Sequence, residues 1–282
     1  MFNAKDGWED RPVTLPCGRC TGCRLEHSRQ WAVRCVHEAQ LHQENCFITL
    51  TYNDAHLPEG GTLVKADFQN FMKRMRKRYL PKGSNRQIRY YQCGEYGEKN
   101  KRPHYHACIF GFDFEDKILW KNDQGNPLYI SPQLSSLWEL DGESLGFSTV
   151  GQVTFQSAAY VARYIMKKIN GDMAESHYQG RLPEYTTMSR RPGIAKNWIE
   201  KYHATDVAHD DQVILNGKSF RPPRYYDQQF EIADPNAWLK IKAARIRKGK
   251  EKPQEKTPAR RKVKAKIRDQ KLKQLKRKLD DD

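Results

Sequence analysis

Residues 102–111 have the sequence RPHYHACIFG, a run of aromatic and apolar residues between a proline and a glycine. This composition predicts a β-strand. Because alternate side chains of a strand lie on the same face, we expect His104 and His106 on one face of a sheet and Tyr105 on the other. Two imidazoles on one strand face suit a divalent metal ion, which needs at least one further ligand.

A carboxylate for this site is present shortly before the histidine pair. Glu95 stands in CGEYG, residues 93–97, at the end of a strand predicted over Gln87–Cys93. A hairpin between the two strands would bring Glu95 beside the imidazoles, and Glu98 is the alternative ligand. A His-x-His pair is also compatible with ordinary surface or core histidines, so the spacing alone leaves both interpretations open.

A helix predicted over Ser157–Ile169 carries two tyrosines one turn apart. Tyr160 and Tyr164 are expected on one polar face, which Lys167 and Lys168 extend by a further turn. The opposite face has an apolar stripe that suits the core. A tyrosine phenoxide can attack a phosphodiester, and a lysine can stabilise the charge that develops. The alternative is a pair of interfacial tyrosines that pack their rings on the fold.

Hydrophobic periodicity and breaker residues predict the other elements of the chain. They are helices over Leu25–Gln43, Lys65–Tyr79, near Leu134–Leu140 and around Ala195–His203, and strands over residues 45–54, Tyr105–Phe112 and Val150–Phe155. We expect residues 113–145 to be an insertion and residues 171–235 to be largely irregular.

Three of the seven cysteines form a C-x-x-C-x-x-C motif, made of Cys17, Cys20 and Cys23. In a chain without an export signal, this spacing favours metal ligands or reduced thiols over disulfides. Zn²⁺ suits such a thiolate set. Packing thiols, an iron–sulfur cluster and redox chemistry are the alternatives. The fourth ligand is expected to be His27, with Cys35 and His37 as competitors.

Positive charge is concentrated at the end of the chain. The formal net charge is +16, and residues 241–282 have 18 Lys and Arg against 6 Asp and Glu. This excess favours nucleic acid as a partner, because phosphates that are neutralised release counterions. A merely solubilising tail is the alternative. The tail residues predicted to contact DNA include Arg260, Arg261, Lys262, Lys264 and Lys266.

Two further stretches combine arginine with aromatic residues. Arg89–Tyr91 and Arg221–Tyr226 are candidates for stacking on the bases of single-stranded DNA, although tyrosines in strands more often pack within the fold. No apolar run approaches the ~18 residues that cross a bilayer, and the first residues lack the pattern of a secretory signal. We therefore expect no membrane segment and a reducing cytoplasm.

In this chain order, the features resemble the HUH endonuclease superfamily of rolling-circle replication initiators. The resemblance is carried by FITLT (47–51), by the paired histidines with an upstream glutamate, and by the two-tyrosine helix with trailing lysines. It is strongest to the replication initiators of gokushovirus-type microviruses, which are small single-stranded DNA phages. The similarity spans roughly residues 15–200 and includes PCGRCTGCR (16–24), residues 28–34 and SRRPG (189–193).

The resemblance implies an α+β fold with an HUH-endonuclease-like central antiparallel sheet, packed helices, a Cys-rich N-terminal segment and a basic C-terminal tail. The histidine strand would lie near the middle of the sheet. The regions we expect are an N-terminal arm with the cysteine motif and a helix over 1–43, the nickase domain over 44–205, an irregular extension over 206–240, and a basic tail over 241–282, either disordered or a lone helix.

The resemblance also assigns roles to the candidate site residues. It implies that His104, His106 and, with less weight, Glu95 bind Mg²⁺ or Mn²⁺, which polarises the scissile phosphate. The implied nucleophiles and their assisting lysines are Tyr160, Tyr164, Lys168 and Lys167.

The implied activity is a metal-dependent, site-specific DNA nickase that also rejoins strands. One tyrosine would cut the viral origin and hold the 5′-phosphate, while the second would act when the displaced strand is closed into a circle. Viral DNA, a host polymerase and a borrowed host helicase are the expected partners, in the host bacterial cytoplasm. A plasmid relaxase or transposase, or a non-catalytic zinc-binding nucleic-acid adaptor, are the alternatives.

Overall fold

The computed structural model describes residues 15–274 apart from 19, 98, 99, 124, 164–167, 169, 170, 172, 208 and 210. In this part of the chain, none of the helices combines the length and the apolar character that crossing a bilayer requires.

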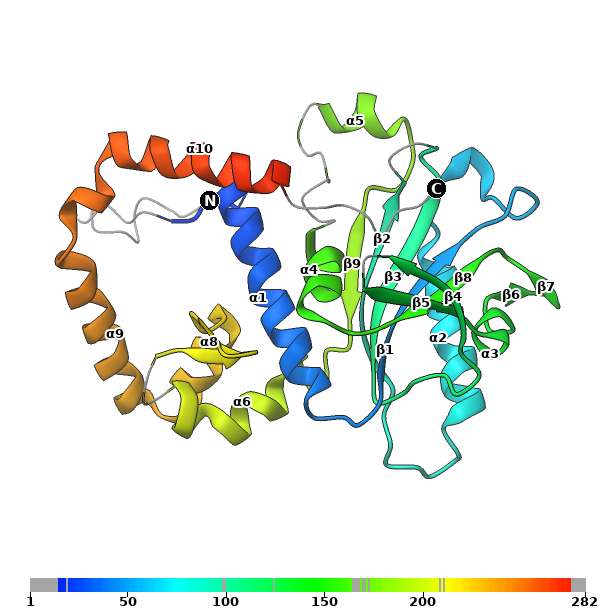
Figure 1. The fold of residues 1–282 in the computed structure, drawn as a ribbon, viewed down its shortest axis with the longest axis horizontal. Coiled ribbons are helices and arrows are strands. Elements are labelled where there is room, and N and C mark those ends of the chain that lie inside the picture. The colour runs from blue at the N-terminus through cyan, green and yellow to red at the C-terminus, as the bar shows by residue number, and fades with distance from the viewer. Residues whose placement is uncertain are drawn as a thin grey trace, which may run out of the picture.

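An antiparallel sheet forms the centre of the described chain (Figure 1). Its strand order is β4-β5-β8-β1-β3-β2-β9, and every neighbouring pair is antiparallel. The strand of the two histidines, β3, lies between β1 and β2, so the expected fold and the inner place of this strand are confirmed. The strands are β1 (Asn45–Thr51), β2 (Arg89–Tyr96), β3 (Pro103–Phe110), β4 (Ile118–Asp123), β5 (Asn126–Ile130), β8 (Ser148–Gly151) and β9 (Tyr185–Met188).

Helices cover both faces of this sheet, and each covering encloses its own core. Helix α2 (Lys65–Tyr79) has the bounds that its periodicity predicts, and its Phe68 and Phe71 are buried against one face. Helices α1 (Thr21–Ala39) and α4 (Phe155–Arg163) cover the other face. Full burial of each such aromatic stabilises the fold by about 1.5–3 kcal/mol.

The alternation along β3 assigns its residues to the two cores. Tyr105, Ala107 and Ile109 belong to the core under α2, whereas Cys108 and Phe110 belong to the core under α1 and α4. His104 and His106 have the same parity as Cys108, so they lie on the face that α1 and α4 cover.

Several elements differ from the sequence prediction. Helix α1 begins at Thr21, inside the cysteine motif, and ends at Ala39 rather than Gln43. The end is fixed by the Asn45 side-chain amide, which donates to the carbonyl groups of Ala39 (3.0 Å) and His42 (3.1 Å). Strand β8 lies earlier than expected, and the supposed insertion contributes the β4–β5 hairpin to the sheet.

The segment expected to be irregular contains the edge strand β9, which pairs with β2. The smaller elements around it are the 3₁₀ helix η2 (Glu59–Gly61), α3 (Pro132–Ser135), β6 (Glu139–Leu140), β7 (Glu143–Ser144), α5 (Met173–Tyr178), α6 (Lys196–Tyr202), the π-helical η4 (His203–Val207), β10 (Val213–Leu215) and β11 (Lys218–Phe220).

The C-terminal helices form a second layer against α1. Helix α8 (Arg224–Ala233) brings Tyr226 to His37 of α1, whose Nδ1 lies 2.8 Å from the tyrosine hydroxyl. Trp198 of α6 stacks on the same imidazole at 3.6 Å between ring centroids. Burial lowers the pKa of His37 to about 3, so this imidazole is neutral in the folded protein.

The residues after 241 form regular structure instead of a disordered tail or a lone helix. They comprise most of α9 (Pro235–Lys250), the 3₁₀ helix η5 (Pro253–Lys256) and α10 (Pro258–Gln274). Figure 1 shows α9 running away from α8 and α10 returning across the start of α1. A Cβ built on Gly22 of α1 would lie 2.6 Å from Nη1 of Arg268, which marks the contact between the two helices.

Candidate active site

The register of the three central strands assembles the candidate site. Glu95 of β2 is directly opposite His104 of β3, and Thr49 of β1 is directly opposite His106. Directly opposed residues in an antiparallel pair share a face, so these side chains lie together under α1 and α4. The structure thus brings together the glutamate and the two histidines that the sequence singles out.

His106 is held on both sides of its imidazole. Its Nδ1 lies 2.9 Å from the Thr49 hydroxyl, and its Nε2 lies 2.9 Å from Oε1 of Glu95. The side chains of His106 and Glu95 are 0% and 1% exposed. Taking two such groups out of water costs several kcal/mol for each ion, which favours their remaining close together or binding an additional charge.

His104 is oriented by the backbone. Its Nδ1 lies 2.6 Å from the carbonyl oxygen of Arg102. A carbonyl only accepts hydrogen bonds, so Nδ1 carries the proton, and in the neutral ring Nε2 keeps its lone pair. The centroids of the two imidazoles are 6.1 Å apart. With the Glu95 carboxylate, they are a donor set that can hold a divalent metal ion.

Tyr160 of α4 lies against this group. Its ring is perpendicular to that of His106, at 89° and 5.1 Å between centroids, and it is 3% exposed. The expectation that it lies on a polar helix face is therefore wrong. Helix α4 is covered by the sheet on one side and by α1 on the other, where the Ser28 hydroxyl donates to the Ala159 carbonyl at 3.0 Å.

The rest of the predicted tyrosine and lysine motif is only partly described. Tyr164 and Lys167 lie outside the described residues, as does the alternative ligand Glu98. Lys168 is half-buried, and its carbonyl accepts from the Arg24 guanidinium at 3.5 Å. The sequence analysis missed Arg163, whose Cζ lies 5.9 Å from the centroid of the Tyr160 ring.

The cysteine motif forms a second candidate metal site at the start of α1. The Sγ atoms of Cys17, Cys20 and Cys23 all lie within 4.8 Å of one another, and those of Cys17 and Cys23 are 3.8 Å apart. A backbone hydrogen bond from Gly18 lowers the pKa of Cys23, but burial and the neighbouring thiols outweigh it, so the pKa is raised. A bound cation would relieve the repulsion that opposes ionisation of clustered thiols.

The candidates for a fourth ligand have other contacts. His27 Nε2 accepts from the Trp31 indole at 3.2 Å, and burial lowers its pKa. Cys35 is fully buried beside Cys108, and this burial raises the pKa of its thiol. The structure brings the three cysteines of the motif together, whereas Cys35 packs in the core between α1 and the sheet.

The basic residues predicted to contact DNA lie on α10. Arg261, Lys262 and Lys266 are exposed, so their charges face solvent. Arg260 and Lys264 contact the carboxylate of Glu255, at 3.2 and 2.7 Å.

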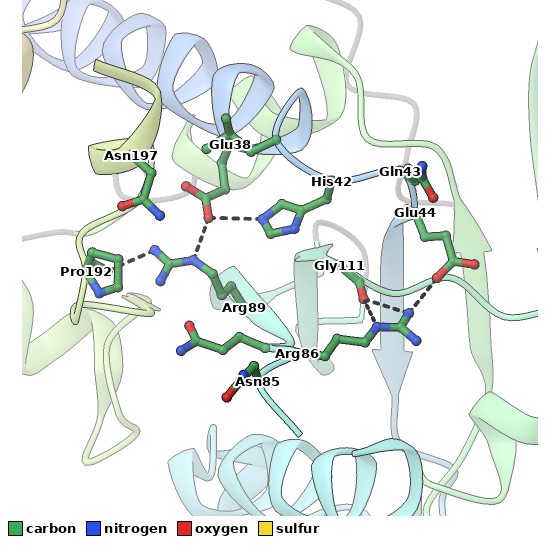
Figure 2. Close-up of a pocket in the computed structure, with 12 residues that line it drawn as sticks. Glu38, His42, Gln43, Glu44, Asn85, Arg86, Arg89, Gly111, Pro192 and Asn197 are labelled. Carbon is green, nitrogen blue, oxygen red and sulfur yellow. Dashed lines mark hydrogen bonds and ion pairs between the residues drawn. The ribbon is translucent and has the colours of Figure 1, made fainter. Parts of the chain in front are cut away.

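A polar pocket of about 700 Å³ lies at the other end of the central strands, where Arg89 is opposite Phe110 (Figure 2). Glu38 accepts from the Arg89 guanidinium and from the Ala195 amide, both at 2.5 Å. Burial raises the pKa of Glu38, but these and the His42 contact outweigh it and lower the pKa. Arg89 also donates to the Pro192 carbonyl at 2.8 Å, so this network anchors the SRRPG segment to α1 and β2.

The base-stacking candidates of the sequence analysis are mostly inside the protein. Tyr91 is buried and stacks on Trp31, with 4.5 Å between ring centroids. Tyr226 is buried against His37. Neither ring is exposed for a base to stack on it.

Comparisons with known proteins identify similar sequences. A family model for replication-associated proteins of the ORF2 type matches residues 45–169, which include the three central strands and α4. The chain is 38% identical to replication-associated protein VP4 of Bdellovibrio phage phiMH2K, over 84% of this chain and 74% of the relative. It is 32% identical to replication-associated protein ORF2 of Spiroplasma virus 4, over 77% and 68%. For replication-associated protein ORF4 of Chlamydia phage 1, the values are 31%, 75% and 52%. No solved structure matches.

Proposed function

The chain belongs to the family of phage replication-associated proteins, and from this premise we propose that it initiates rolling-circle replication by nicking one strand of the viral DNA. The observation that carries the proposal is the position of Tyr160, whose ring lies against His106 while His106 contacts Glu95. A nucleophile beside a divalent-metal donor set, on a strongly basic chain, is suited to a phosphodiester as substrate.

In the proposed reaction, the Tyr160 hydroxyl loses its proton and its oxygen attacks the scissile phosphorus. The bond to the 3′-oxygen breaks, and this oxygen takes up a proton to become the 3′-OH from which a polymerase extends. The 5′-phosphate remains esterified to tyrosine. One phosphodiester replaces another, so the step needs no ATP.

His104, His106 and Glu95 are the residues that would hold Mg²⁺ or Mn²⁺, which would polarise the scissile phosphate and stabilise the charge on its oxygens. The neighbouring groups of this chain position that set. The Arg102 carbonyl keeps the proton of His104 on Nδ1, and the Thr49 hydroxyl fixes the ring of His106. Burial of Tyr160 limits the access of water, which would protect the phosphotyrosine from hydrolysis.

Rejoining needs a second nucleophile, and Tyr164 is the proposed one. It would cut the regenerated origin after one round, and the released 3′-OH would attack the first phosphotyrosine to close the circle. Lys168 and Lys167 would stabilise the negative charge of these steps. Host polymerase and helicase are the proposed partners, and the host cytoplasm is the proposed place of action.

The cysteine motif is proposed to hold a structural Zn²⁺ through Cys17, Cys20 and Cys23. It lies at the start of α1, which packs along α4. A cation at this position would therefore fix the beginning of the helix that covers the nucleophile.

The test is to incubate the protein and Mn²⁺ with the supercoiled replicative circle of its own genome, and to look for relaxed DNA that carries SDS-resistant protein. We expect an adduct at one site that EDTA abolishes. Tyr160→Phe and Tyr164→Phe should each keep part of the nicking, and the double variant should form no adduct, with Tyr202→Phe as the control.

Two results would contradict the proposal. An adduct in the double variant would remove both tyrosines from the role of nucleophile. Tight DNA binding without nicking by the unaltered protein would favour the non-catalytic adaptor.

A further inference from the structure

Two large aromatic side chains are exposed at one side of the central sheet. Trp120 of β4 is 46% exposed and Phe147, just before β8, is 47% exposed. Their rings are in contact, at 5.0 Å between centroids and 63° between planes. Neither side chain contributes to the two cores, so packing of the fold does not explain them.

A β-bulge places Trp120. Leu119 is opposite Tyr129 and Lys121 is opposite Leu128, so Trp120 is the extra residue on β4. Bulges bend a strand and redirect a side chain, and they are frequent next to active sites. The bulge brings the indole to Phe147, which lies on the far side of β5.

Phe147 lies next to the candidate active site in the sheet. Its carbonyl accepts from both the backbone N–H and the hydroxyl of Thr51, each at 2.9 Å. Thr51 is in turn opposite His104. Continuing the β1–β8 register, in which Thr49 is opposite Thr149, places Phe147 on the face of the histidines. Two strand spacings, about 10 Å, therefore separate Phe147 from His104 along the sheet.

We propose that Trp120 and Phe147 form a stacking platform for bases of single-stranded DNA beside the nick site. This proposal rests on the proposed function and names the form of its substrate. Aromatic rings bind bases without sequence preference, because every base has a π-face. The ammonium group of Lys121 lies 6.0 Å from the Trp120 ring, where it can meet the adjoining phosphate.

The burial of the nucleophile supports a single strand over a duplex. Tyr160 is 3% exposed, so a phosphate reaches it only if the strand separates from its complement and bends into the site. Bases released in this way lose their stacking partners, and exposed rings on the same face of the sheet replace them.

The experiment measures binding of fluorescein-labelled oligo(dT), and of a duplex of equal length, without metal. Trp120→Ala and Phe147→Ala should each weaken oligo(dT) binding about tenfold. Duplex binding should change less than about twofold, because its bases remain stacked. Trp120→Phe should keep most of the affinity, and Leu119→Ala, a neighbouring exposed apolar side chain, is the matched control.

Photocrosslinking with oligonucleotides that contain 5-iododeoxyuridine tests the position of the bases. We expect crosslinked peptides that contain Trp120 or Phe147. Unchanged oligo(dT) affinity in the double alanine variant, or equal losses for oligo(dT) and duplex, would overturn the platform. Because neither assay requires cleavage, the platform is upheld by these results even if the unaltered protein fails to nick.

Discussion

The histidine site and the cysteine motif are assembled in different ways. His104, His106 and Glu95 come from two strands, and only the register of the sheet brings them together inside the protein. The three cysteines come from one short loop at a helix start, and Cys17 and Cys20 remain exposed. The difference teaches that donor groups set by the tertiary fold are shielded from water, as chemistry at phosphorus requires, whereas groups set by local spacing suit a structural ion.

The largest expected effect comes from breaking the buried site. His106→Ala removes the imidazole that contacts both Glu95 and the Tyr160 ring, and we expect nicking to fall about a thousandfold. DNA affinity should remain within about threefold, since phosphate contacts by other residues dominate binding. Gel assays of nicking and fluorescence anisotropy measure the two quantities. His177→Ala, an exposed histidine, is the control, and full nicking by His106→Ala would remove this residue from the site.

A pH series tests the other end of the helix that carries the cysteines. The pKa of His37 is lowered to about 3, so the unfolded chain takes up a proton near pH 6.5 that the folded chain refuses. Stability is therefore present above pH 6.5 and declines toward pH 3, by about 1.4 kcal/mol for each pH unit. Urea unfolding of His37→Gln should depend less steeply on pH than unfolding of the unaltered protein. Parallel curves would show that His37 does not cause the decline, and His177→Gln is the exposed control.

Removing the cysteine thiols should affect structure more than chemistry. With Cys17, Cys20 and Cys23 changed to Ser, we expect bound zinc, measured by plasma mass spectrometry, to be lost. Nicking of saturating DNA should change less than about threefold, because the buried site does not share these ligands. Cys35→Ala is expected to keep its zinc. Loss of nicking in parallel with zinc would show that the two sites are coupled and would end the distinction.

The smallest effect is expected from α10. Ending the chain at Thr257 removes the exposed cations of this helix but keeps Arg245, which contacts Asp211 and Asp227 at 2.5 and 2.8 Å. DNA affinity near 0.1 M salt should fall about fivefold to tenfold, and the salt dependence should flatten, with nicking of saturating DNA preserved. Binding at several salt concentrations measures this. An unchanged slope would remove α10 from the DNA-contacting surface, and Lys73→Gln with Lys77→Gln on α2 is the control.

The sequence predicts much of this fold because its signals are local. Helix α2 has an unbroken apolar stripe and matches its predicted bounds, and β1 and β3 are rich in the residues that strands favour. The strand β9 has only four residues, too few for a clear alternation. The burial of Tyr160 escapes prediction because periodicity cannot reveal that α1 covers the other side of α4. The bulge at Trp120 depends on pairing with β5, which no single segment encodes.

The contact between α10 and the start of α1 has a consequence for synthesis. The cysteine motif is among the first segments to leave the ribosome, whereas Arg268, its neighbour at Gly22, is among the last. Domains fold largely in the order in which they emerge. The three thiols are therefore open to a metal ion, or to an oxidant, throughout translation of the chain between them, and α10 can pack beside them only when translation is nearly complete.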